Sequence, residues 1–252
     1  MGSHLSDLEQ QQANLVGVQL ADFRAANLFQ LVAEQLPVGH SVLDVGCGAG
    51  GLVAFLNLAG VDARGIDTSA ATVDAVRGYY EALGVDQTRV RQATADQLIQ
   101  DGERFDSVVC MDCLEHVEDD QQLFDELVAL VKPGGKLIIT VPALMALYGE
   151  RDERIGHFRR YEKRELARLV EGRALTIESL RFWNILGVAP TYISQKILGR
   201  NVDEGFRYGQ VTLRKRVMRY GLNLWFRHLE NRIRPPIGMT LFMVLSKAPE
   251  PA

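Results

Sequence analysis

A group of closely spaced glycines follows a short apolar run early in the chain. Residues 42–45 read Val-Leu-Asp-Val and predict a buried strand, and Gly46, Gly48, Gly50 and Gly51 come directly after it. Glycines at such a turn let the backbone approach a ligand without a β-carbon in the way, and the N–H groups of the following helix face that ligand. The spacing therefore predicts a site for a nucleotide-like cofactor.

Two kinds of cofactor use this arrangement. Gly46, Gly48 and Gly51 satisfy the spacing of a dinucleotide-binding loop, and Asp67 follows at about the distance, ~20 residues, of a ribose ligand. Asp44 favours S-adenosylmethionine instead, because a carboxylate beside the glycines disfavours a pyrophosphate but stabilises an ammonium and a sulfonium group. We therefore expect S-adenosylmethionine, with S-adenosylhomocysteine as the product. A nicotinamide-dependent oxidoreductase is the alternative.

The glycine segment resembles the first motif of the class I methyltransferases, Val-Leu-Asp-Val-Gly-Cys-Gly-x-Gly, over residues 42–50. Further matches follow in that family's order. Residues 65–67 resemble the acidic end of strand two, residues 105–106 the start of strand four, and residues 131–136 the turn before strand five. The resemblance covers residues 40–142 and implies a Rossmann-like fold that binds S-adenosylmethionine.

The resemblance also assigns residues to parts of the cofactor. Asp67 is expected to hold the ribose hydroxyls, and either Thr94 or Asp96 to reach the adenine amino group. Arg24 corresponds to a family arginine that meets the cofactor carboxylate. The full expected set is Arg24, Asp44, Gly46, Cys47, Gly48, Gly50, Asp67, Thr68, Thr94, Ala95, Asp96 and Met111.

A polar segment, residues 111–117, follows the fourth predicted strand, at the sheet edge where parallel sheets bind ligands. It resembles the ubiquinone-biosynthesis O-methyltransferases, which read Met-Glu-x-Leu-Glu-His-Val there, with an acid, a Glu and the His associated with a divalent metal. Asp112, Glu115 and His116 match those positions. Such a metal can lower the pKa of an acceptor hydroxyl. Local packing and hydrogen bonding are the alternative role.

A second segment, Gly-His-Phe-Arg-Arg-Tyr at residues 156–161, follows the fifth predicted strand. It resembles a loop of bacterial small-molecule methyltransferases that covers the acceptor pocket. His157 is the expected general base, because an ordinary histidine pKa suits removal of a proton near neutral pH, and His116 is the second candidate. Alternatively, His157 only hydrogen-bonds the loop.

The other polar residues of this loop are expected to bind the acceptor. Arg159 and Arg160 can hold an acidic group through paired hydrogen bonds, and Tyr161 adds a hydroxyl. The alternative places the arginines in solvent beside Asp152 and Glu153.

These groups need a sheet to position them. Strands alternating with helices predict an α/β fold, a mostly parallel seven-stranded sheet with helices on both faces. A leading helix or helix pair is expected over residues 6–36, and the last strand is expected to be antiparallel and to return to the sheet edge. The predicted strands cover residues 41–45, 63–66, 90–93, 107–111, 136–141, 175–182 and 240–246.

The chain divides into four predicted parts. Residues 1–4 resemble an expression scar, 5–182 form the methyltransferase core, 183–234 an inserted helical cap for substrate or dimer contact, and 235–252 the final strand and tail. The cap contains an amphipathic basic stretch at residues 214–227. We expect it to pack on its own domain, with an anionic lipid surface, an acidic substrate or a second copy of the chain as alternatives.

The whole-chain composition narrows the function. A net charge of −4 disfavours nucleic acid as a partner, and three cysteines without paired spacing suit a reduced, cytoplasmic protein. The expected reaction is methyl transfer to a small-molecule acceptor, most favourably to the oxygen of a hydroxyl or acid group in a metabolite or natural product. N-methylation and S-adenosylmethionine binding without catalysis are alternatives.

Overall fold

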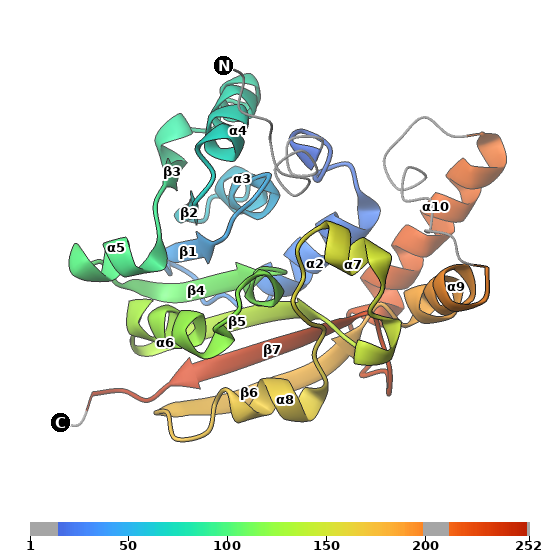
Figure 1. The fold of residues 1–252 in the computed structure, drawn as a ribbon. Coiled ribbons are helices and arrows are strands. Elements are labelled where there is room, and N and C mark those ends of the chain that lie inside the picture. Colours follow the sequence, from blue (N-terminus) through green and yellow to red (C-terminus); the bar gives the residue numbers. More distant parts are fainter. Residues whose placement is uncertain (1–14, 199–211, 251–252) are drawn as a thin grey trace, which may run out of the picture.

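Seven strands form one sheet with the order β3-β2-β1-β4-β5-β7-β6 in the computed structural model, which describes residues 15–198 and 212–250 (Figure 1). All are parallel except β7, which runs antiparallel to both of its neighbours. The strands are β1 (Val42–Val45), β2 (Ala63–Asp67), β3 (Val90–Gln92), β4 (Phe105–Met111), β5 (Val131–Pro142), β6 (Leu175–Trp183) and β7 (Thr240–Lys247). The predicted fold class is confirmed.

The position of β7 corrects one expectation. The sequence pattern places residues 240–246 at the sheet edge, but β7 lies between β5 and β6, and β6 forms the edge. The burial explains this order: Thr240 to Leu245 are buried, whereas Thr176, Ile177 and Glu178 of β6 are exposed. A strand with a continuous apolar run is suited to the interior of a sheet, and one with charged and polar residues to its edge.

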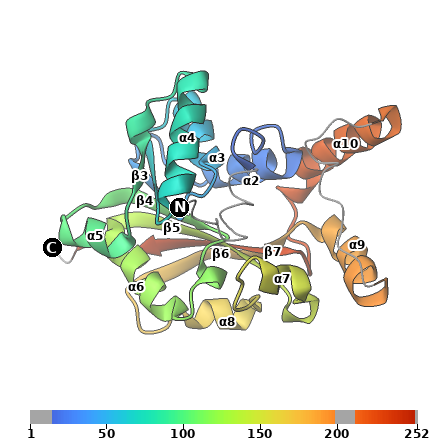
Figure 2. The same ribbon diagram turned by 45° about the horizontal axis from the view of Figure 1, so that its top comes forward.

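Helices cover both faces of the sheet. In Figure 2, α2, α3 and α4 lie above it, and α6 and α8 lie below. They are α2 (Phe23–Ala33), α3 (Gly51–Leu58), α4 (Ala70–Leu83), α5 (Ala95–Gln100), α6 (Asp120–Leu130), α7 (Glu150–Arg154) and α8 (Lys163–Arg168), with a short 3-10 turn at Leu114–His116.

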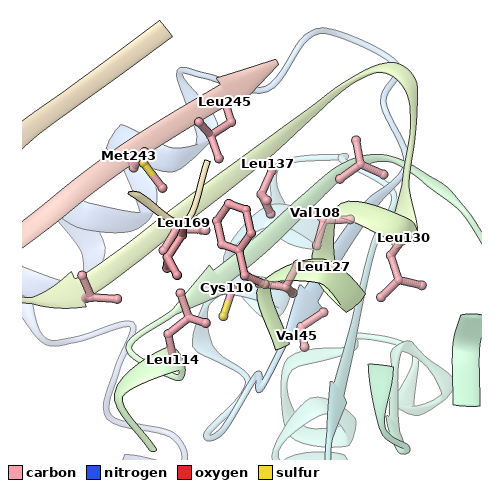
Figure 3. Close-up of a cluster of buried hydrophobic side chains, with 14 of the residues drawn as sticks. Val45, Val108, Cys110, Leu114, Leu127, Leu130, Leu137, Leu169, Met243 and Leu245 are labelled. Carbon is pink, nitrogen blue, oxygen red and sulfur yellow. The ribbon is translucent and has the colours of Figure 1, made fainter. Parts of the chain in front are cut away.

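The two faces have separate cores because side chains alternate along each strand. Met243 and Leu245 of β7 pack with α6 and α8, whereas Phe242 and Val244 between them pack with α2, α3 and α4. Figure 3 shows the first core, in which Leu127 of α6 lies among apolar side chains of the strands. Because both faces of the strands are buried, a shift in register would move every side chain into the wrong core. The register therefore determines which residues lie at the carboxyl edge of the sheet.

The described part of the predicted leading segment contains one regular helix. Residues 15–36 are described, and among them α2 (Phe23–Ala33) is the one helix of several turns; residues 6–14 lie outside the described part of the chain, so a helix pair stays a prediction. Gly17 has φ of 83°, which interrupts a right-handed helix, and the Asp22 carboxylate accepts a hydrogen bond from the Arg24 N–H. A glycine turn followed by this N-cap therefore starts the helix at Phe23.

Between β6 and β7 most of the described chain, up to Glu230, is helical. Its helices are α9 (Val188–Tyr192), a π-helical turn (Ile193–Ile197), α10 (Leu213–Trp225) and a second π-helical turn (Phe226–Glu230). Phe226 anchors this segment, since its ring lies 4.8 Å from that of Trp183 and 5.9 Å from that of Phe23. From this anchor α10 extends away from the sheet (Figure 1). Within residues 15–198 and 212–250, no helix has the length and apolarity needed to cross a bilayer.

Leu127 tests the core. It is fully buried, so Leu127→Ala should lower the free energy of unfolding by about 2 to 5 kcal/mol in urea denaturation, through lost apolar burial and the cavity left behind. Leu58→Ala is the matched control, because Leu58 is 57% exposed on α3 and should cost less than about 1 kcal/mol. Equal losses in the two variants would contradict this account of the core.

Candidate active site

The turn after β1 has no room for a side chain at Gly46. Gly46, Gly48 and Gly50 all have positive φ angles, 71°, 48° and 71°. A β-carbon on Gly46 would lie 2.5 Å from the Sγ atom of Cys113, at the end of β4. The Gly46 N–H donates to the carbonyl of Ile66 at 2.9 Å, which fastens the turn to the end of β2. Both backbone conformation and packing therefore require glycine at position 46.

Asp67 joins the turn to β2. Its carboxylate accepts hydrogen bonds from the backbone N–H groups of Gly48 and Ser69, each at 2.9 Å. These bonds hold the acid at the carboxyl end of the strand, where a ligand of a parallel sheet is expected.

Two adjacent cavities lie at this edge. The large cavity has about 790 Å³ and the small cavity about 230 Å³. Gly46, Asp112 and His116 border both of them, so the two cavities meet at the glycine turn.

Most of the predicted cofactor residues border these cavities. Asp67, Thr68, Thr94 and Ala95 border the large cavity. Arg24, Asp44, Cys47, Gly48 and Met111 border the small one. Asp96 borders neither: it is exposed, and its carboxylate accepts from Gln100 at 2.5 Å. Gly50 lies beneath the turn, where its carbonyl accepts from the Tyr80 hydroxyl at 2.7 Å.

A further cavity of about 750 Å³ lies at the opposite, amino edge of the strands. Its charged side chains are paired, Arg89 with Asp62 and Arg91 with Glu103. Such mutual pairing is typical of a solvated charged surface, so we place the candidate active site at the carboxyl edge.

Asp44 is a buried acid with an unsatisfied oxygen. It is 3% exposed, and its Oδ1 atom has no hydrogen-bond partner in the described part of the chain. Burial, and to a lesser extent the nearby charge of Asp67, raises the pKa of Asp44 to about 8. A cationic group in the small cavity would offset both effects, because it favours the ionised carboxylate.

Two histidines meet at the floor of the small cavity. The rings of His116 and His157 lie 4.5 Å apart in an edge-to-face arrangement. Burial, and to a lesser extent the proximity of His157, lowers the pKa of His116 to about 4. His116 is therefore a neutral imidazole near neutral pH.

His157 is oriented by a buried acid. Its Nδ1 atom lies 3.1 Å from Oδ1 of Asp152, and its Nε2 atom lies 3.7 Å from Oε1 of Glu115. Burial alone would raise the pKa of Asp152, but the hydrogen bond from His157 and the charge of Arg160 keep it below its ordinary value. An ionised Asp152 accepts the Nδ1 proton and leaves Nε2 as the basic atom beside the small cavity.

Glu115 has the opposite surroundings. It is fully buried, and neither carboxylate oxygen has a hydrogen-bond partner among the described residues. Burial raises its pKa well above the ordinary value, and the charge of Asp112 adds to this. Asp112 itself accepts from the Thr140 hydroxyl at 3.2 Å.

The predicted metal ligands are only partly brought together. One donor atom each from Glu115, His116 and His157 lies within 4.8 Å of the others. This group contains the expected ligands Glu115 and His116, but His157, which was predicted as the general base, takes the place of Asp112. Two imidazoles and a carboxylate suit a divalent transition ion, and the unpartnered oxygens of Glu115 fit such a group.

The loop residues expected to bind the acceptor differ in position. Arg160 borders the small cavity, but its guanidinium pairs with Asp152 at 2.9 Å. Arg159 pairs with Asp120 at 3.0 Å, and the Tyr161 hydroxyl donates to the same carboxylate at 2.8 Å. Arg159 and Tyr161 border neither cavity, and their contacts attach the loop to the start of α6.

Four residues that line the small cavity or orient His157 were not identified from the sequence. The Gln19 side chain accepts from the Gly51 N–H at 3.0 Å, ahead of the predicted cofactor residues. Met239 and Thr240 border the small cavity because β7 lies beside β5, and no local pattern indicates this. The sequence did contain a signal for Asp152, because it is an acid that precedes His157 by five residues. It lies in the short helix α7.

The comparison with known families identifies the family of this chain. Residues 19–180 match the methyltransferase domain family, and this segment contains the glycine turn and both histidines. The chain belongs to the class I S-adenosylmethionine-dependent methyltransferases. This membership decides against the nicotinamide-dependent oxidoreductase that the glycine spacing alone permitted.

This methyltransferase resembles proteins of several kinds. The ubiquinone biosynthesis O-methyltransferase of Coxiella burnetii (strain Dugway 5J108-111) is 35% identical over 140 residues, which are 54% of this chain and 58% of that protein. The match therefore covers less than two thirds of that relative.

Solved structures share the fold. The PH0226 protein of Pyrococcus horikoshii OT3 has a TM-score of 0.60 at 18% identity, covering 92% of this chain and 93% of that one. Geranyl diphosphate C-methyltransferase of Streptomyces coelicolor A3(2), solved with Mg²⁺, geranyl diphosphate and S-adenosyl-L-homocysteine, has a TM-score of 0.55 at 15% identity, covering 88% and 77%.

Gly46→Ala should weaken binding of S-adenosylhomocysteine by about tenfold or more in isothermal titration calorimetry, because the added methyl group meets Cys113 and strains the turn. Gly60→Ala is the matched control: Gly60 has φ of 82°, but no atom lies within 4 Å of the position that an added methyl group would take, so the substitution adds backbone strain without the clash. Unchanged affinity in Gly46→Ala would show that the turn does not contact the cofactor.

Asp44 should make cofactor binding depend on pH. Below about pH 8 the free protein holds a proton on Asp44, and a cationic ligand must displace it. The affinity for S-adenosylmethionine should therefore rise with pH, by up to about tenfold per unit, and level off above about pH 8. Calorimetry should detect the released proton. Asp44→Asn should bind weakly with a flat pH profile; a retained slope would exclude Asp44 as its source.

Proposed function

We propose that this methyltransferase transfers a methyl group to an oxygen atom of a small-molecule acceptor in the small cavity, with His157 as general base. The observation that carries the proposal is the Asp152–His157 pair, which directs a basic nitrogen to a cavity continuous with the glycine turn. The name of the 35% identical relative, an O-methyltransferase, supports oxygen as the methylated atom.

The cofactor is proposed to lie across both cavities. Its adenosine occupies the large cavity, with the ribose on Asp67 and the adenine near Thr94. Its methionine part follows the glycine turn into the small cavity, where Asp44 faces the cationic groups and Arg24 the carboxylate. The sulfonium methyl then points to the shared wall formed by Gly46, Asp112 and His116.

The reaction is a displacement at the methyl carbon. The acceptor oxygen forms a bond to carbon as the bond to sulfur breaks, and the sulfur keeps the electron pair of that bond in S-adenosylhomocysteine. Nε2 of His157 removes the hydroxyl proton, and the ionised Asp152 stabilises the resulting imidazolium. Alignment of oxygen, methyl carbon and sulfur supplies the rest of the rate enhancement.

The small cavity indicates a compact acceptor. Its whole volume of about 230 Å³, which the acceptor would share with the methionine part of the cofactor, is below the range of about 300 to 1,000 Å³ common for drug-sized ligands. Leu28 and Phe29 add apolar side chains to its lining. A ring or short chain that carries a hydroxyl or acid group suits this combination.

A divalent metal is the second way to activate a hydroxyl. Glu115, His116 and His157 would hold it, and it would lower the pKa of the acceptor oxygen. His157 cannot then act as the free base, so the two mechanisms make opposite predictions for treatment with a chelator.

His157→Gln should lower kcat by about 10² to 10⁴-fold, with little change in the affinity for S-adenosylhomocysteine. Asp152→Asn should lower it as well, because the amide no longer enforces the Nδ1–H tautomer. The assay uses labelled S-adenosylmethionine with a cell extract and mass spectrometry of labelled small molecules, then repeats the measurement on the acceptor found. Glu153→Gln, an exposed neighbour on α7, is the matched control and should retain activity.

Activity should persist after incubation with EDTA; loss that a divalent ion restores would favour the metal mechanism. Transfer to an amine with no effect of His157→Gln would favour N-methylation, and label in protein or nucleic acid alone would contradict a small-molecule acceptor. Cofactor binding without any labelled product would favour a role in S-adenosylmethionine binding alone.

A further inference from the structure

One face of α10 carries an apolar stripe in water. Leu213, Val217, Tyr220 and Leu224 follow the spacing that places side chains on a single helix face. They are 74%, 64%, 66% and 38% exposed. We call these four residues the α10 stripe. The expectation that the apolar residues of this stretch pack on their own domain is therefore wrong for the stripe.

The reason is that α10 has a second apolar face. Leu222 and Trp225 are half-buried and pack with the core above the sheet, and Asn223 accepts a hydrogen bond from Asn27 of α2 at 2.7 Å. The helix is thus attached to α2 by one face only, near its carboxyl end. The stripe is not needed for that attachment.

The charge on α10 has one sign. Its thirteen residues include Arg214, Lys215, Arg216 and Arg219 and no acid. The first three are exposed, and Arg219 is half-buried. At the 3.6-residue period of a helix, Arg214 and Arg216 lie on the two sides of the α10 stripe, whereas Lys215 and Arg219 lie on the opposite side of the helix.

Exposed apolar side chains also occur on a second helical segment. Tyr192, Ile193, Ile197 and Leu198, at and after α9, are 47% to 65% exposed. Both views place α9 and α10 at the same end of the molecule, beyond α2 and α7 (Figures 1 and 2).

We propose that α10 and α9 form a docking surface for an anionic phospholipid bilayer. Apolar side chains can enter the boundary between headgroups and acyl chains, while the flanking Arg214 and Arg216 meet lipid phosphates. A second copy of the chain fits less well, because pairing two α10 helices through their stripes would bring these arginines close to those of the other copy. Nucleic acid would satisfy the charges but leave the apolar stripe against water or phosphate.

The docking surface is linked to the active-site loop. The Lys196 ammonium donates to the Tyr148 carbonyl at 2.8 Å, and the Tyr148 hydroxyl donates to the His157 carbonyl at 2.7 Å. Docking would therefore hold the loop that carries His157 close to the lipid surface.

The test is cosedimentation of the full chain with vesicles. Wild type should bind phosphatidylglycerol–phosphatidylcholine vesicles, bind phosphatidylcholine alone weakly, and lose affinity as salt rises from about 0.05 to about 0.5 M. Val217→Glu/Leu224→Glu should lower the affinity by about tenfold or more, since two apolar contacts are lost and two repelling charges gained.

The control has the same substitutions elsewhere. Val38→Glu/Leu58→Glu makes the same change of residue type and charge at positions that are 104% and 57% exposed, away from α10, and should bind vesicles nearly as well as wild type. Circular dichroism and melting temperature confirm that both double variants fold.

Three results would overturn the proposal: equal loss in both double variants; a wild-type dimer in analytical ultracentrifugation that the stripe variant alone converts to monomer; or RNA that competes fully with the vesicles and binds the stripe variant as well as wild type.

Discussion

The site depends on one steric constraint, the absence of any side chain at Gly46. Cys113 from the end of β4 occupies the space a methyl group would need, and the Ile66 carbonyl at the end of β2 accepts the Gly46 N–H. The turn is therefore packed between the two strands that flank β1. Because the large and small cavities meet along this turn, its close packing sets the distance between Asp67 on one side and His116 on the other.

Three buried acids around the cavities show how the fold distributes charge. Asp152 is ionised because Arg160 and His157 stabilise its charge, so the protein itself satisfies it. Asp44 Oδ1 and both oxygens of Glu115 have no hydrogen-bond partner among the described residues, and burial raises the pKa of both acids. The fold thus satisfies the acid that orients His157 and leaves the other two carboxyl groups incompletely hydrogen-bonded.

The features that the sequence predicted are local ones: the glycine turn, Asp67 and the alternation of strands and helices each depend on neighbouring residues. The interior position of β7 depends on long-range pairing, and so do the roles of Met239 and Thr240 in the small cavity. For α10, periodicity indicated amphipathicity but not which of two apolar faces the domain covers, because that depends on where α2 lies.

The position of β7 also bears on the order in which the fold can be completed. Among the described strands, β6 pairs only with β7, so it cannot join the sheet by backbone hydrogen bonds until residues 240–247 lie beside β5. During synthesis β5 is then an open edge of a five-stranded sheet, with buried-type side chains awaiting a partner. The nascent chain is therefore prone to aggregation until residues 240–247 have been synthesised. We expect the yield of folded protein to depend on rapid completion of the chain or on binding of a chaperone in this interval.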